Sequence, residues 1–104
     1  MENKETTTEL TQEFKSFISV TDGALCNNIY QGYFQILSNK HPSRSIWVKV
    51  MITSLPTHDD TTGQEIRYFE EYTLGPNSKY NLACNVPGPT GQRFFWTPVE
   101  ARWA

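Results

Sequence analysis

The sequence has few cysteines and histidines and no long apolar run, and several classes of protein require such features. Its 104 residues include two cysteines and two histidines, and no apolar run approaches the roughly 20 residues of a membrane-spanning helix. Nine Lys and Arg against eleven Asp and Glu give a formal net charge of −2, which offers no general attraction to nucleic acid or to an anionic membrane. We therefore expect no nucleic-acid partner and no membrane insertion.

The amino-terminal segment lacks the features of an export signal. Residues 1–10 contain neither an apolar stretch nor a small-residue cleavage site. If Met1 is the natural start, the default compartment is the cytoplasm, whereas a trimmed mature form would be extracytoplasmic. The composition predicts a flexible polar tail over residues 1–12 and a single domain over residues 13–104.

Beyond this tail the dominant hydrophobic period is two, which predicts β-strands. In the run 45–53, apolar β-branched residues alternate with Trp47, Lys49 and Met51. Comparable runs predict strands over residues 30–37, 66–74, 80–84 and 92–103, separated by loops and turns rich in Pro, Gly and Asn. We expect 30–37 and 45–53 to pair as a hairpin. The uneven alternation of 66–74 and Pro98 in 92–103 indicate edge strands or local irregularities.

The first apolar segment is ambiguous between helix and strand over residues 8–18. Leu10, Phe14 and Ile18 have the spacing of one face of a helix, whereas 17–21 is rich in β-branched residues. We favour a strand from about Lys15 to Thr21, ended by the Asp22-Gly23 turn signal.

These elements together predict the fold class. Six strand candidates within about ninety residues, with no confident helix between them, are typical of two packed sheets. We expect an all-β chain that forms an antiparallel two-sheet β-sandwich of immunoglobulin or fibronectin type III style. A small β-barrel is the alternative.

The two cysteines are 58 positions apart and form no CxxC pair, so the sequence indicates no zinc site. Cys26 and Cys84 are compatible with one disulfide, which would stabilise the fold by roughly 4 kcal/mol in the chain-entropy model. The alternative is two reduced, buried thiols that act as small hydrophobic side chains.

No grouping of residues indicates catalysis, a metal or a cofactor. His58 is followed by Asp59 and Asp60, but no nucleophile is fixed near them and the ligand spacing of a calcium loop is missing. Asp and Gly in this segment are explained by a turn. We expect a non-enzymatic protein without metal or cofactor, and a small metal-dependent enzyme centred on these residues is the least favoured hypothesis.

The aromatic residues carry the functional hypothesis. Tyr33, Trp47, Phe94 and Trp96 occupy positions that alternate with the expected core face, and Lys49 shares the face of Trp47. Exposed aromatics on a sheet favour a module that binds a protein partner through a sheet face or an edge strand. The alternative is a carbohydrate-binding sandwich with Tyr33, Trp47 and Trp96 as a stacking platform. A purely structural explanation is that so small a sandwich buries part of both faces.

Overall fold

A computed structural model of the chain describes residues 10–55, 65–88 and 92–104. Most of the predicted tail (1–9) and the loop with His58, Asp59 and Asp60 lie outside the described residues. The helix and strands of the described residues are α1 (Gln12–Lys15), β1 (Ile18–Asn27), β2 (Gly32–Asn39), β3 (Ile46–Leu55), β4 (Ile66–Leu74), β5 (Ser78–Cys84) and β6 (Arg93–Trp103). No helix in this described part has the length and apolar character needed to cross a membrane.

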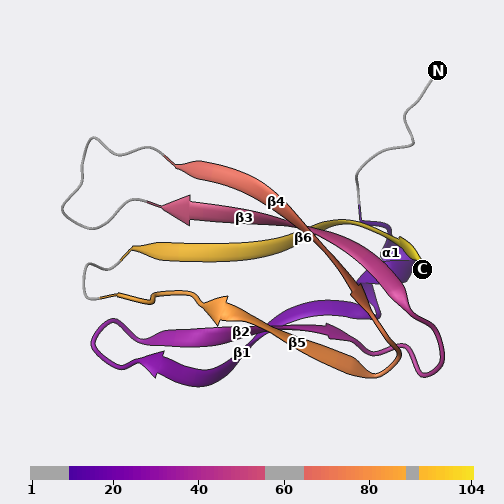
Figure 1. The fold of residues 1–104 in the computed structure, drawn as a ribbon, viewed down its shortest axis with the longest axis horizontal. Coiled ribbons are helices and arrows are strands. Elements are labelled where there is room, and N and C mark those ends of the chain that lie inside the picture. Colours follow the sequence, from indigo (N-terminus) through magenta and orange to yellow (C-terminus); the bar gives the residue numbers. More distant parts are fainter. Residues whose placement is uncertain (1–9, 56–64, 89–91) are drawn as a thin grey trace.

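Two antiparallel three-stranded sheets pack together as a β-sandwich (Figure 1). Sheet A has the order β1-β2-β5 and sheet B has the order β4-β3-β6. The predicted antiparallel two-sheet sandwich is thereby confirmed, while the immunoglobulin or fibronectin type III style stays a prediction. The predicted hairpin between the second and third strands is wrong, because β2 pairs with β1 and β5 whereas β3 pairs with β4 and β6.

The core forms where β3 faces sheet A. Alternate residues of β3 are buried, as the period-two pattern predicts, and the intervening ones are half-buried on the other side. Leu37 of β2, in sheet A, and Phe14 of α1 join this core. The buried cluster consists of Phe14, Ile18, Leu37, Ile46, Val48, Val50 and Leu74.

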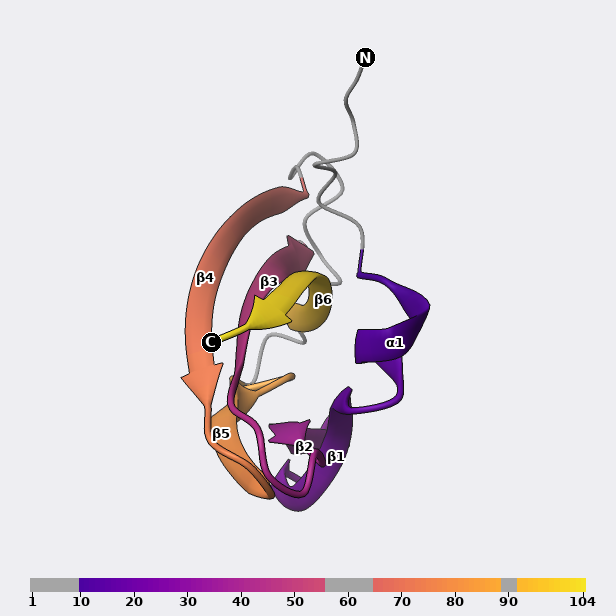
Figure 2. The same cartoon turned by 90° about the vertical axis from the view of Figure 1, so that its right-hand side faces the viewer.

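The ambiguous segment forms both a helix and a strand. α1 is a single turn, and its Phe14 ring packs 4.8 Å from that of Trp103 at the end of β6. In Figure 2, α1 and β4 lie at opposite margins of the molecule. The predicted end of the strand at Asp22-Gly23 is wrong, because β1 continues to Asn27 through two register shifts. At Gly23 a Cβ would lie 3.0 Å from the side chain of Ile36, so this glycine permits a close approach of two strands.

Buried Asn39 stabilises the connection between β2 of sheet A and β3 of sheet B. Its side-chain amide donates to the carbonyls of Arg44, Leu74 and Gly75 at 2.9 to 3.1 Å, and its Oδ1 accepts from the backbone N–H of His41 at 2.9 Å. This amide therefore ties the β2–β3 connection to the end of β4, and β3 starts in the other layer.

A disulfide joins the outer strands of sheet A. Cys26 near the end of β1 and Cys84 at the end of β5 are bonded, with their Cα atoms 6.0 Å apart. The loop it closes spans 58 positions, so the bond restricts the unfolded chain substantially.

Candidate functional site

The outer face of sheet B is the side that β3 turns away from the core. Its ladder pairs set Trp47 between Thr73 and Arg102, and Lys49 between Glu71 and Glu100. Further along, Met51 lies between Phe69 and Thr97, and Thr53 lies between Arg67 and Phe95. Directly opposed residues point to the same side of a sheet, so these side chains form one continuous surface.

An apolar band crosses this face, and we define it as Met51, Phe69 and Phe95. Phe69 is 54% exposed and Phe95 is 45% exposed, although both are large hydrophobic side chains. They come from the two edge strands: Phe69 is directly opposite Met51 of the central strand, and Phe95 is opposite Thr53 and so diagonal to Met51. A contiguous exposed apolar surface with a polar surround is typical of a binding site rather than of scattered surface residues.

Charged side chains surround the apolar band. The described charged residues of this face are Lys49, Arg67, Arg93 and Arg102 against Glu65, Glu71 and Glu100, four cations and three anions, a formal balance of +1 where the whole chain carries −2. The ammonium of Lys49 lies 5.3 Å from the centroid of the Phe69 ring. This face therefore carries one more cation than anions, whereas the whole chain carries more anions than cations.

Trp47 is held in place by its neighbours. The guanidinium of Arg102 stacks 3.8 Å from the indole centroid, and the indole N–H donates to a carboxylate oxygen of Glu71 at 3.2 Å. One face of the indole ring is thus covered and its polar atom is engaged.

Of the five predicted binding residues, Trp47 and Lys49 lie on this face. The predicted outward position of Phe94 and Trp96 is wrong: both are opposite core-facing residues of β3, and Trp96 packs against the core. The physical reason is a register shift between the pairs Lys49–Glu100 and Val50–Pro98, which leaves one extra residue in β6 and reverses its alternation. Phe95 is the outward aromatic in this part of the strand.

The predicted outward position of Tyr33 is also wrong. Leu37 is the fully buried residue of β2, and strict alternation along β2 puts Tyr33 on the same, core-facing side. Tyr33 is half-buried at the end of the sheet, where its hydroxyl donates to Gln31 at 3.3 Å. Tyr33, Trp47 and Trp96 therefore do not form a common stacking platform.

The sequence prediction missed Met51, Phe69 and Phe95 as members of the site. For Met51 the signal was available, since it alternates with the buried residues of β3. Phe69 was obscured by the uneven pattern of β4, and Phe95 by the reversal near Pro98.

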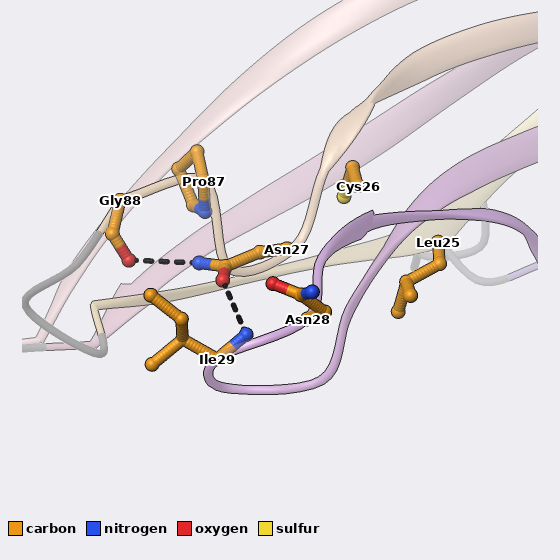
Figure 3. Close-up of a pocket in the computed structure, with 7 residues that line it drawn as sticks. All are labelled: Leu25, Cys26, Asn27, Asn28, Ile29, Pro87 and Gly88. Carbon is orange, nitrogen blue, oxygen red and sulfur yellow. Dashed lines mark hydrogen bonds between the residues drawn. The ribbon is translucent and has the colours of Figure 1, made fainter.

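A separate depression of about 480 Å³ lies beside the β1–β2 turn (Figure 3). The side chain of Asn27 lies across it. Its amide donates to the carbonyls of Val86 and Gly88 at 2.8 and 2.9 Å, and its Oδ1 accepts from the backbone N–H of Ile29 at 3.0 Å. The polar atoms of Asn27 are satisfied within the protein. The hydrogen bonds of Asn27 therefore connect the β1–β2 turn to the segment that follows β5, and this structural role accounts for the polar atoms in the depression.

No cluster of three or more His, Cys, Asp or Glu side chains suited to a metal occurs among the described residues. His41 has a structural environment, since its Nδ1 accepts from the N–H groups of Ser43 and Arg44 and its ring packs 4.6 Å from Phe17. The hypothesis centred on His58, Asp59 and Asp60 lies outside the described residues.

Comparisons with known proteins give no further guide. No protein-family model, curated protein or solved structure matches this chain.

Proposed function

We propose that this chain is a non-catalytic binding module that recognises a protein partner through the outer face of sheet B. The observation that supports this proposal best is the exposure of Phe69, directly opposite Met51, and of Phe95, diagonal to Met51, on one face. Phe, Met and Arg are enriched in protein interfaces, and an apolar centre with a charged rim is the usual arrangement there.

A protein partner agrees better with this geometry than a sugar does. Stacking on a sugar needs an accessible aromatic plane, whereas one side of the Trp47 ring is covered by Arg102. Tyr33 and Trp96, the other members of the predicted platform, lie on the core-facing side of their strands. The exposed rings of the outer face are phenyl groups, which suit the apolar centre of a protein interface.

The charge of the outer face indicates the chemistry of the partner. Its balance of four cations against three anions favours a partner surface with an apolar centre and a slightly acidic rim. Such complementarity raises the association rate at low salt more than it raises the final affinity. The disulfide between Cys26 and Cys84 supports function in an oxidising compartment, because disulfides form and persist there.

The test begins with affinity capture from the native host and identification of the captured protein. Its affinity is then measured for wild type and for Phe69→Ser and Phe95→Ser. Truncation of a central apolar side chain should weaken binding by about tenfold or more, with an unchanged melting temperature, since both rings are exposed.

Ile29→Ser is the matched control, because Ile29 is 73% exposed at the β1–β2 turn, away from this face. It should bind as wild type does. The proposal is wrong if both phenylalanine variants keep full affinity while the Ile29 variant loses it.

A further inference from the structure

Among the four edge strands of the two sheets, β4 carries the fewest features that prevent pairing with another strand. The ladder of β1 contains two register shifts and that of β5 contains one. β6 contains Pro98, which lacks an N–H, next to its own register shift. β4 pairs with β3 without interruption from Leu74 to Ile66 and contains no proline.

The edge of β4 that faces away from β3 pairs with no described strand, and near its Leu74 end the Tyr72 ring packs 5.1 Å from that of Tyr80 of β5. Figures 1 and 2 both show β4 at the margin of the molecule, with no described strand beyond it. Three of its apolar side chains are exposed: Ile66 by 60%, Tyr68 by 43% and Phe69 by 54%. Since neighbouring residues of a strand point to opposite faces, β4 exposes apolar surface on both. A long, regular, apolar edge is a template for a further strand.

We propose that two copies of this chain associate by antiparallel pairing of their β4 strands, about a two-fold axis at Phe69. In this register, Phe69 is opposite Phe69 of the second copy. Arg67 is opposite Glu71 of the second copy, and symmetry repeats this pair on the other side of the axis. Opposite charges and paired aromatic rings are the cross-strand combinations that stabilise a sheet.

The neighbouring symmetric registers lack this complementarity. An axis at Glu70 would place Glu70 opposite itself and Phe69 opposite Glu71. An axis at Tyr68 would place Glu65 opposite Glu71. Like charges directly opposed across strands destabilise the pairing, so the sequence of β4 favours the axis at Phe69.

The other face of β4 fits the same register. There Tyr68 is opposite Glu70 of the second copy, whose carboxylate also accepts from Tyr72 of its own chain. Ile66 is opposite Tyr72, whose ring also packs against Tyr80 of its own chain. Arg67 is already paired with Glu65 at 2.5 Å, but that ion pair is exposed and such pairs contribute little. Arg67 can therefore exchange this partner for Glu71 of the second copy.

The association would join two three-stranded sheets into one of six strands, ordered β6-β3-β4-β4-β3-β6. The outer faces of both copies would lie on the same side, with the two apolar bands adjoining at Phe69. This inference goes beyond partner binding, because it concerns a second copy of this chain and its tests use the purified protein without a partner. The two contacts share Phe69, Arg67 and Glu71, whereas Phe95 belongs to the outer face alone.

The first test is sedimentation of wild type over a range of concentrations. We expect a monomer–dimer equilibrium, with a mass approaching twice 12.0 kDa, and dissociation constants of about 1–100 μM. The variants Arg67→Glu and Glu71→Arg should each dimerise roughly ten- to a hundredfold more weakly, because both cross-strand pairs become like-charged. An equimolar mixture of these two variants should form a heterodimer, since each supplies the charge that the other needs.

The second test checks the register. Two Phe69→Cys chains should crosslink under mild oxidation, since the new thiols face each other at the axis. Thr73→Cys is the matched control on the same side of β4, where the two thiols would be far apart. The proposal is overturned if wild type stays monomeric up to about 1 mM. Crosslinking of the Thr73 variant but not of the Phe69 variant would equally overturn it, as would failure of the charge variants to associate when mixed.

Discussion

Sheet A and sheet B have three strands each, yet their strands are paired very differently. The ladders of sheet A contain three register shifts, whereas those of sheet B contain one, near Pro98. Sheet A is closed by a disulfide between its outer strands. Sheet B is built on β3, whose inward residues are fully buried. Sheet A therefore depends on one disulfide and on side-chain hydrogen bonds. Sheet B depends on a regular ladder and an aliphatic core, which leaves its outer face free for contacts.

The largest expected effect comes from removing the crosslink of sheet A. The double substitution Cys26→Ser with Cys84→Ser should lower the free energy of unfolding by about 4 kcal/mol, because the unfolded chain gains the freedom of a 58-position loop. The melting midpoint should fall by roughly 20 °C. Hydrogen exchange should then show β1 and β5 losing protection before β3 does. Ala83→Ser, an exposed neighbour of Cys84, is the control and should melt as wild type does. Equal loss of protection in both sheets would contradict the comparison.

A smaller effect is expected at the junction of the sheets. Asn39→Ala should cost about 2 kcal/mol, because the carbonyls of Arg44, Leu74 and Gly75 lose their common donor. Chemical denaturation measures this loss. Asn81→Ala is the matched control, since Asn81 is an exposed asparagine of β5, and it should change the stability little. If both substitutions cost the same, the junction is not held by this side chain.

The smallest expected effect is a change of stability with pH that depends on Tyr72, at the edge of sheet B. Burial, followed by the hydrogen bond to Glu70 and the charge of Glu70, raises the pKa of Tyr72 well above the usual value of about 10. The folded protein therefore holds this proton more tightly than the unfolded chain. The resulting stability is fully present below about pH 10 and is lost as the pH rises further.

Spectrophotometric titration of the phenols measures this effect. In Tyr72→Phe the latest-titrating of the five tyrosines should disappear, and the decline of stability above about pH 10 should become shallower. Tyr30→Phe should retain the late phenol, because Tyr72 is still present. A late phenol that survives in Tyr72→Phe would show that another tyrosine is responsible.

Much of the fold could be predicted from local patterns. Every predicted strand from 30–37 onward corresponds to an observed strand, because period-two alternation directly reflects a pleated backbone with one buried side. The run 45–53 gave both the strand and its buried face. The predicted pairing of 30–37 with 45–53 failed, because turn residues do not show whether the chain folds back or crosses to the other sheet.

The candidate site was predictable only in part. Trp47 and Lys49 were assigned to the outer face because β3 is regular. Phe94 and Trp96 were misassigned because one extra residue in β6 exchanges its two faces, and no local signal fixes where that residue is inserted. Tyr33 was misassigned because both sides of β2 carry apolar residues, so its pattern alone does not tell which side meets the other sheet.

The sequence by itself determined the strands from residue 30 onward, their approximate ends, the absence of an excess of positive charge and the two cysteines available for a crosslink. Tertiary structure alone decided which strands are neighbours, which sides of β2 and β6 are covered, and that Phe69 and Phe95 lie near Met51 on one surface. The physical reason is the difference in sequence separation between the residues that interact. Alternation is a property of adjacent residues, whereas burial and pairing depend on segments far apart in the chain that meet only in the folded state.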